Sequence, residues 1–166
     1  MIGAIAAGFL GAFPLWMLLL GLLIGYLRGR ETHRGRSAQF LASETIFWAI
    51  GISGIWGFIF HVFFQPVAAR SIGWAPGGFE YEVGFANLAF GVLGVMSRWR
   101  TLEFAWATVI GSSIFLLLAA VNHVAQIIAA HNVAPGNAGV ILWTDIFIPI
   151  IAILLLSRAQ RYARTL

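Results

Sequence analysis

Five long runs of apolar residues constrain the fold of this chain more than any other feature. They cover approximately residues 2–26, 40–64, 82–97, 102–130 and 140–156. A helix of about 20 consecutive apolar residues crosses the hydrocarbon core of a bilayer. With 60% hydrophobic and only 10% charged residues, the chain has more apolar surface than a soluble domain can bury. The sequence therefore predicts an all-α membrane protein, a single domain built as a bundle of five transmembrane helices.

The arginine residues predict how these helices are oriented. All ten basic residues are Arg, and nine of them lie in three segments, at 28–37, 98–101 and 157–166. Five spans place these segments on one side of the membrane and only Arg70 on the other. Because Arg accumulates in cytoplasmic loops, we expect a cytoplasmic C-terminus and an N-terminus outside. Glu44 falls toward the inner side, where these Arg residues could pair with it.

This arrangement predicts the location and the partners of the protein. It fits a multi-pass protein of the cell membrane, such as a bacterial inner membrane, whose first partner is the lipid bilayer. The net charge of +4 is explained by orientation in the membrane, so we expect no nucleic acid as a partner. Other membrane subunits, or further copies of the same chain, are compatible with the sequence.

A layer of polar residues near the outer ends of the predicted spans is the second informative pattern. At about 1.5 Å per helical residue, ionisable groups from four different spans fall at a similar depth. Such groups are costly in hydrocarbon, so we expect them to face the interior of the bundle. They are His61, Glu80, Glu82, His123 and Asp145.

Helical periodicity adds amides to this layer and sorts the carboxylates. Polar residues of the run at 102–130 share one helical face, and Asn87 lies on a glycine-rich face of the run at 82–97. Glu80 and Glu82 point apart in a helix, so we assign Glu82 to the pocket and expect Glu80 to pair with Arg70. The predicted pocket comprises His61, Arg70, Glu80, Glu82, Asn87, Asn122, His123, Gln126 and Asp145.

Several ligands suit such a pocket. Two His with two carboxylates form a ligand set typical of zinc or iron, although no local motif such as HExxH accompanies them. Two His on different spans could also hold a haem, which is a weaker match. A quinone-like lipophilic molecule is the third option. The predicted metal ligands are His61, Glu82, His123 and Asp145.

Other chemistries are excluded by what the sequence lacks. The chain contains no Cys, which rules out thiolate metal sites and Cys nucleophiles. It contains no hydrolase elbow, P-loop or dinucleotide-binding fingerprint.

The segment SIGWAPGGFEYEVGFANLAFGVLG, residues 71–94, resembles an uncharacterised family of small bacterial integral membrane proteins. More distantly, the layout is similar to DoxX-like membrane proteins, in which a glycine-proline loop precedes a Glu-containing, Gly-rich helix. This likeness covers roughly residues 45–157 and implies a four-helix core, with the run at 2–26 as an addition. Of the candidate site residues, only Glu82 matches the DoxX-like pattern, as the Glu of the Gly-rich helix. DoxX-like proteins include subunits associated with quinone-linked sulfur oxidation.

Three functions stay open at this point. The first is a redox-associated membrane subunit whose outer pocket binds a quinone-like molecule or a metal. The second is a structural or accessory subunit of a larger membrane complex, in which the polar groups only hold helices together. The third is a proton-coupled transporter or channel with His123 and Asp145 as relay groups, although the Leu- and Ala-rich stretch between Ser112 and Asn122 disfavours a continuous aqueous path.

Overall fold

The computed structural model describes residues 11–163, and this part of the chain forms helices and no strand. In chain order the elements are α2 (Phe13–Gly29), α3 (Arg34–Thr45), the π-helical segment η1 (Ile46–Ile52), α4 (Ser53–Phe63), α5 (Gln65–Ile72), α6 (Phe79–Met96), the short 3₁₀ turn η2 (Ser97–Trp99), α7 (Leu102–Ala130), α8 (Pro135–Ala138) and α9 (Val140–Ala163). Because α3, η1 and α4 follow one another without a break, they form one long helical rod.

Three helical segments are long and apolar enough to cross a membrane, which indicates a membrane protein. They are Arg36–Phe63, Leu102–Ala130 and Pro135–Ala163. The outer surface agrees with this assignment, because large apolar side chains project from several helices without a partner helix to cover them. Those more than half exposed include Leu23, Phe63, Leu118, Ile128 and Leu154.

The observed helices extend past the predicted apolar runs at polar residues. α7 coincides with the run predicted at 102–130, whereas α3 begins at Arg34, α6 begins at Phe79 and α9 continues to Ala163. Hydropathy marks only the apolar part of a helix, and Arg, Glu and Gln are good helix formers that prolong it. Residues 2–10 of the first predicted run, and Arg164 of the tail, lie outside the described residues.

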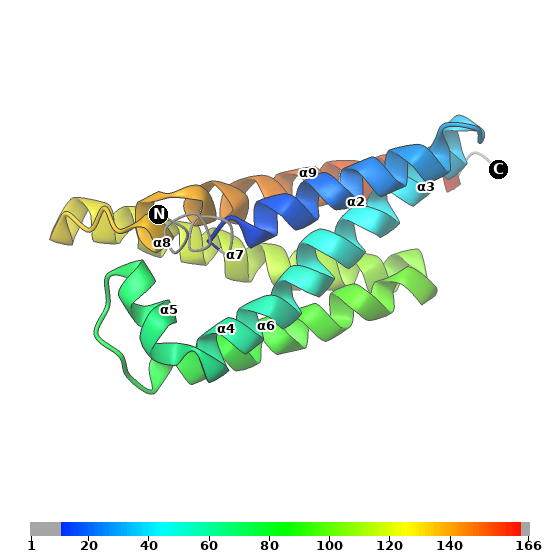
Figure 1. The fold of residues 1–166 in the computed structure, drawn as a ribbon. Coiled ribbons are helices and arrows are strands. Elements are labelled where there is room, and N and C mark those ends of the chain that lie inside the picture. Colours follow the sequence, from blue (N-terminus) through cyan, green and yellow to red (C-terminus); the bar gives the residue numbers. More distant parts are fainter. Residues whose placement is uncertain (1–10, 164–166) are drawn as a thin grey trace.

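The helices run back and forth between two ends of the molecule (Figure 1). One end, which we call the Arg-rich end, holds the α2–α3 connection, η2 and the last turns of α9. The other, which we call the α8 end, holds α5 and α8. The Arg-containing segments 28–37, 98–101 and 157–163 therefore share one end, as the charge pattern predicts. Arg70, in α5, lies at the other.

Glycine residues let two pairs of helices approach closely. A Cβ atom added to Gly54 would lie 2.7 Å from the Gly91 Cα, and one added to Gly91 would lie 2.7 Å from the Ile55 backbone nitrogen. Likewise, a Cβ on Gly21 of α2 would lie 2.8 Å from the Glu44 carbonyl oxygen of α3. In the absence of a hydrophobic driving force between helices in lipid, such close backbone packing is what holds them together. The glycine-rich face of the run at 82–97 therefore packs α6 against α4.

A third interface, formed by apolar side chains, joins the helical rod to α7 and α9. Its buried apolar side chains form one cluster, which includes Ile46, Ile50, Val109, Ile148 and Leu156. Together with the glycine interfaces, this cluster fixes how each long helix is rotated about its axis. That rotation decides which polar residues face inward.

Candidate functional site

Two ionisable residues from different helices meet at the α8 end. α7 runs to Ala130, the chain turns through α8, and α9 starts at Val140, so the last turns of α7 pack against the first turns of α9. His123 of α7 and Asp145 of α9 lie on these turns, with 3.6 Å between His123 Nε2 and Asp145 Oδ2. Both residues are buried, each with 8% of its surface exposed. The structure thus brings together two of the predicted pocket residues.

Asn137 of α8 holds the imidazole of His123 from the other side. Its side chain is fully buried, and its amide nitrogen donates to the backbone carbonyls of His123 at 3.2 Å and Asn132 at 2.8 Å. Because the nitrogen has two acceptors, the amide oxygen faces the imidazole and accepts from His123 Nδ1, 2.8 Å away. Asn137 therefore fixes the tautomer: the proton sits on Nδ1, and Nε2 faces Asp145.

With the imidazole proton on Nδ1, Nε2 of His123 faces the Asp145 carboxyl group across 3.6 Å. This distance exceeds a normal hydrogen bond. Neither atom is satisfied by the other, so both can bond to a third partner.

The turn that carries Asn137 is anchored on α5. Asn132 Nδ2 donates to the Ile72 carbonyl at 2.8 Å, and Asn132 Oδ1 accepts from the Ala134 backbone nitrogen at 3.1 Å. Gly73 ends α5 with a φ of 82° and approaches so closely that a Cβ there would lie 2.6 Å from Asn132 Oδ1. Glycine meets both the left-handed backbone and the close contact. α5 therefore positions the imidazole through two asparagines.

Glu80, and not Glu82, is the buried carboxylate at the start of α6. Glu80 is 3% exposed and accepts from the Gly77 backbone nitrogen at 3.2 Å. Glu82 lies two residues further along the helix, points to another side and is exposed. The assignment of Glu82 to the pocket is wrong, because the carboxylate nearer the helix start folds back onto a free backbone N–H group.

His61 lies near the end of α4 and is half-buried. Its Nδ1 is buried without a hydrogen-bond partner among the described residues, and no ion pair there joins it to a carboxylate. The expected pairing of Glu80 with Arg70 is not found: Arg70 is exposed, and in the described part of the chain it forms no ion pair. Of the predicted layer, the described residues contain one joined pair, His123 of α7 with Asp145 of α9.

The three predicted amide residues lie in different surroundings. Asn87 packs against α4 and donates to the Val83 carbonyl of its own helix at 2.9 Å, so it does not bond across the interface. Gln126 is half-buried. Asn122 is exposed, since it lies about 100° around α7 from the buried His123. The prediction that this whole polar face points into the bundle is wrong for Asn122.

The proposed metal ligands do not come together. Among residues 11–163, no group of three or more His, Asp or Glu side chains lies close enough to hold a metal ion. His123 and Asp145 meet, but His61 forms no ion pair among the described residues, and Glu82 is exposed. Equal depth in the bundle is therefore not sufficient for a ligand set, because the helices also have to turn their side chains toward one point.

A third buried carboxylate lies at the Arg-rich end. Glu44 of α3 is fully buried and forms ion pairs with Arg28 of α2 and Arg98 of η2, with 2.9 Å between Arg98 Nη2 and Glu44 Oε1. Trp48 Nε1 donates to Glu44 Oε2 at 3.2 Å. Each guanidinium group also lies 4.7 Å from the centre of a phenylalanine ring. The expected pairing of Glu44 with Arg residues of the inner connections is confirmed, and it joins three segments of the chain.

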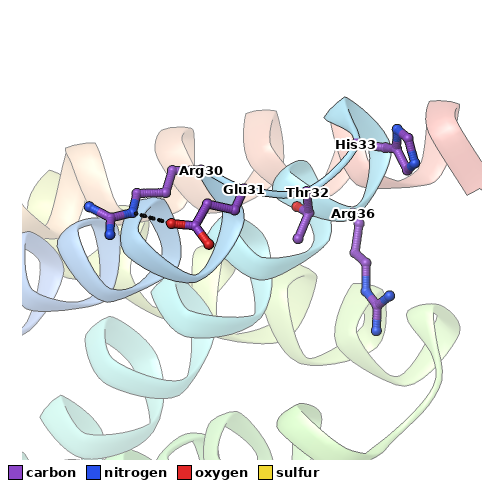
Figure 2. A pocket seen from close by; sticks show the side chains of 5 residues that line it. All are labelled: Arg30, Glu31, Thr32, His33 and Arg36. Atoms are coloured by element: carbon purple, nitrogen blue, oxygen red, sulfur yellow. Dashed lines mark ion pairs between the residues drawn. The ribbon is translucent and has the colours of Figure 1, made fainter.

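The α2–α3 connection surrounds a hollow of about 490 Å³ (Figure 2). Arg30 and Glu31 point toward each other there, with 3.5 Å between Arg30 Nε and Glu31 Oε1, while His33 points away from them. Thr32 and Arg36 complete the lining. The lining is polar and mostly exposed, so the hollow does not enclose a ligand.

Residues 11–165 match a protein family described as a Family of unknown function (DUF6790). The chain belongs to this family. No curated protein and no solved structure matches the chain. The prediction of an uncharacterised family is thereby confirmed, whereas the similarity to DoxX-like proteins stays a prediction.

In this DUF6790 protein, Asn137 is a site residue that the sequence pattern does not reveal. The residue lies in the turn-rich segment 131–139, which reads as a connection because it contains Pro135 and two glycines. One feature of the sequence does point to it. A histidine deep in a span needs a hydrogen-bond partner for each ring nitrogen, and the turn that follows its helix contains Asn132 and Asn137.

Proposed function

We propose that the chain crosses a bacterial inner membrane five times, with its N-terminus outside and its C-terminus in the cytoplasm. α2 and α6 have 17 and 18 residues, which at about 1.5 Å per residue is close to the thickness of the hydrocarbon core. The gathering of Arg residues at one end supports a cytoplasmic Arg-rich end. The α8 end, with His123 and Asp145, then lies near the outer surface.

Because the chain contains no Cys, single cysteines can report this topology. Ala75→Cys, in the exposed α5–α6 connection, is expected to react with a membrane-impermeant maleimide added to intact cells. Arg100→Cys, exposed at the Arg-rich end, is expected to react only after the membrane is permeabilised. The reverse pattern would contradict the proposed orientation, and equal labelling of both sites in intact cells would contradict the five-span arrangement.

We further propose that the protein binds a lipophilic molecule with a polar carbonyl head, such as a quinone, at the His123–Asp145 pair. The observation that carries this proposal is the 3.6 Å separation of His123 Nε2 and Asp145 Oδ2. Asn137 keeps the imidazole proton on Nδ1, so Nε2 and the Asp145 carboxyl group face the ligand, and this pair donates to a carbonyl oxygen when it carries a further proton. Each residue retains 8% of its surface, so the head group of a lipid-dissolved molecule reaches the pair from the bundle surface.

Quinone titration of the purified protein tests this proposal. In detergent, a short-chain benzoquinone is expected to bind the parent protein. Its dissociation constant should rise about 10- to 100-fold in His123→Gln and in Asp145→Asn, because each variant loses one charge-assisted hydrogen bond to the ligand. The measurement is equilibrium dialysis. Asn122→Ala removes an exposed polar neighbour of His123 and should bind like the parent. Absence of binding by the parent, or unchanged binding by both site variants, would refute the proposal.

The role of an accessory subunit is the second candidate. It is favoured by Asn137, whose three hydrogen bonds join α7, α8 and the turn at Asn132 and so serve to hold helices together. A proton channel along α7 has less support. Thr108 and Ser112 donate to backbone carbonyls of their own helix, Phe104 and Thr108 respectively, which leaves their hydroxyl protons unavailable to a water chain.

A further inference from the structure

We propose that the Arg-rich end carries a binding site for one anionic phospholipid, in the hollow between α3 and α9. This hollow has a volume of about 320 Å³ and lies on the opposite end of the molecule from the His123–Asp145 pair. The lipid proposal requires that the helices span a membrane, but it does not depend on quinone binding at the His123–Asp145 pair. Its lining residues come from two packed helices: Arg34, Ser37, Ala38 and Leu41 of α3, and Leu155, Arg158 and Tyr162 of α9.

The two helices present matching stripes to the hollow. On α3 the lining residues follow Arg34 by three, four and seven positions, which places them on one face and puts Leu41 about 10 Å deeper than Arg34. On α9 the same spacing runs in the opposite direction, from Leu155 in the interior through Arg158 to Tyr162. Both stripes are therefore apolar toward the membrane interior and cationic toward the surface. An amphiphile with its head at the surface and its chain along the helices matches this order.

The charge of the hollow selects an anionic head group. Arg34 and Arg158 are exposed, and in the described part of the chain neither forms an ion pair. No carboxylate lines the hollow, and two carboxylates of the same end are already paired, Glu44 with two other Arg residues and Glu31 with Arg30. Two unpaired guanidinium groups beside an apolar floor suit a phosphate diester, which guanidinium binds through paired hydrogen bonds.

The neighbouring hollow in the α2–α3 connection provides an internal comparison. Its lining contains two Arg residues but also Glu31, and none of its five side chains is apolar. A carboxylate repels an anionic head group, and a polar floor offers nothing to an acyl chain. The α3–α9 hollow combines unpaired cations with apolar side chains, as a lipid site requires. A surface that is only basic lacks the apolar side chains.

Native mass spectrometry of the full-length, delipidated protein in detergent tests the proposal. It compares phosphatidylglycerol with phosphatidylcholine carrying the same acyl chains. The parent is expected to bind phosphatidylglycerol more tightly by about 30-fold, equivalent to about 1 kcal/mol for each Arg near the surface. The double variant R34Q/R158Q is expected to lose this preference while retaining its unfolding temperature, because both side chains are exposed.

A matched control separates a defined site from general basic charge. R36Q/R100Q removes two exposed Arg residues from the same end but outside the hollow, and should keep the preference within about twofold. Equal losses in the two double variants would overturn the site, as would full retention in R34Q/R158Q. Equal binding of the two lipids by the parent would also overturn it, since the unpaired cations would then have no anionic partner.

Discussion

Replacing both Arg28 and Arg98 by Gln is expected to lower the free energy of unfolding by about 3 kcal/mol. The reason is that Glu44 is fully buried and these two residues supply its only ion pairs in the described part of the chain. Without them, its negative charge stays in a dry environment with only the Trp48 indole as a donor. Breaking a buried ion pair typically lowers the free energy of unfolding by about 3 to 5 kcal/mol. We expect the lower value because both guanidinium groups are partly exposed. The measurement is denaturant unfolding in detergent micelles.

Two further variants identify the cause of this loss. Adding Glu44→Gln to the double variant removes the isolated charge, and we expect it to restore more than half of the lost stability. R30Q/R100Q removes the same number of Arg residues from exposed positions of the same end and should change stability by less than about 0.5 kcal/mol. A triple variant as unstable as the double variant would show that the buried charge is not the source of the loss.

The second large effect is expected at the glycine interface between α4 and α6. Gly91→Leu should lower the free energy of unfolding by about 3 kcal/mol, because a Cβ at this position would already lie 2.7 Å from the Ile55 backbone nitrogen. Backbone atoms cannot move aside as a flexible side chain does, so the two helices must separate. Leucine is a better helix former than glycine, and any loss therefore arises from the interface and not from the helix itself.

A leucine elsewhere on α6 is the matched control. Ala89 is exposed on the same helix, and Ala89→Leu should leave stability within about 0.5 kcal/mol of the parent. The comparison uses the same denaturant titration. Equal stability of the two leucine variants would show that close backbone packing does not hold α4 against α6.

The positions of the helices were largely predictable from the sequence, because hydropathy and glycine spacing are local properties of the chain. The run predicted at 102–130 coincides with α7, and the glycine-rich face noted on the run at 82–97 lies in the interface between α4 and α6. Boundaries were less accurate, since α9 continues as a helix to Ala163, beyond the last apolar residue of its run. A helix does not have to end where the hydrocarbon does.

The candidate site was predictable only in part. Depth along each span correctly indicated that His123 and Asp145 could meet. Depth could not distinguish Glu80 from Glu82, because that choice depends on how α6 starts and which backbone N–H group is free. It also gave no sign of Asn137, which reaches His123 only because the turn after α7 folds back against α5.

By itself, the sequence determined that this chain is a helical membrane protein with its Arg residues gathered at one end. Both conclusions follow from the cost of placing polar or charged groups in hydrocarbon, and that cost depends on residue type and position along the chain. Only the tertiary structure decided which polar groups touch: His123 meets Asp145 instead of joining a larger cluster, and Glu44 lies between two Arg residues. Contacts between helices depend on how each helix is rotated, and that rotation is set by close packing across the whole bundle.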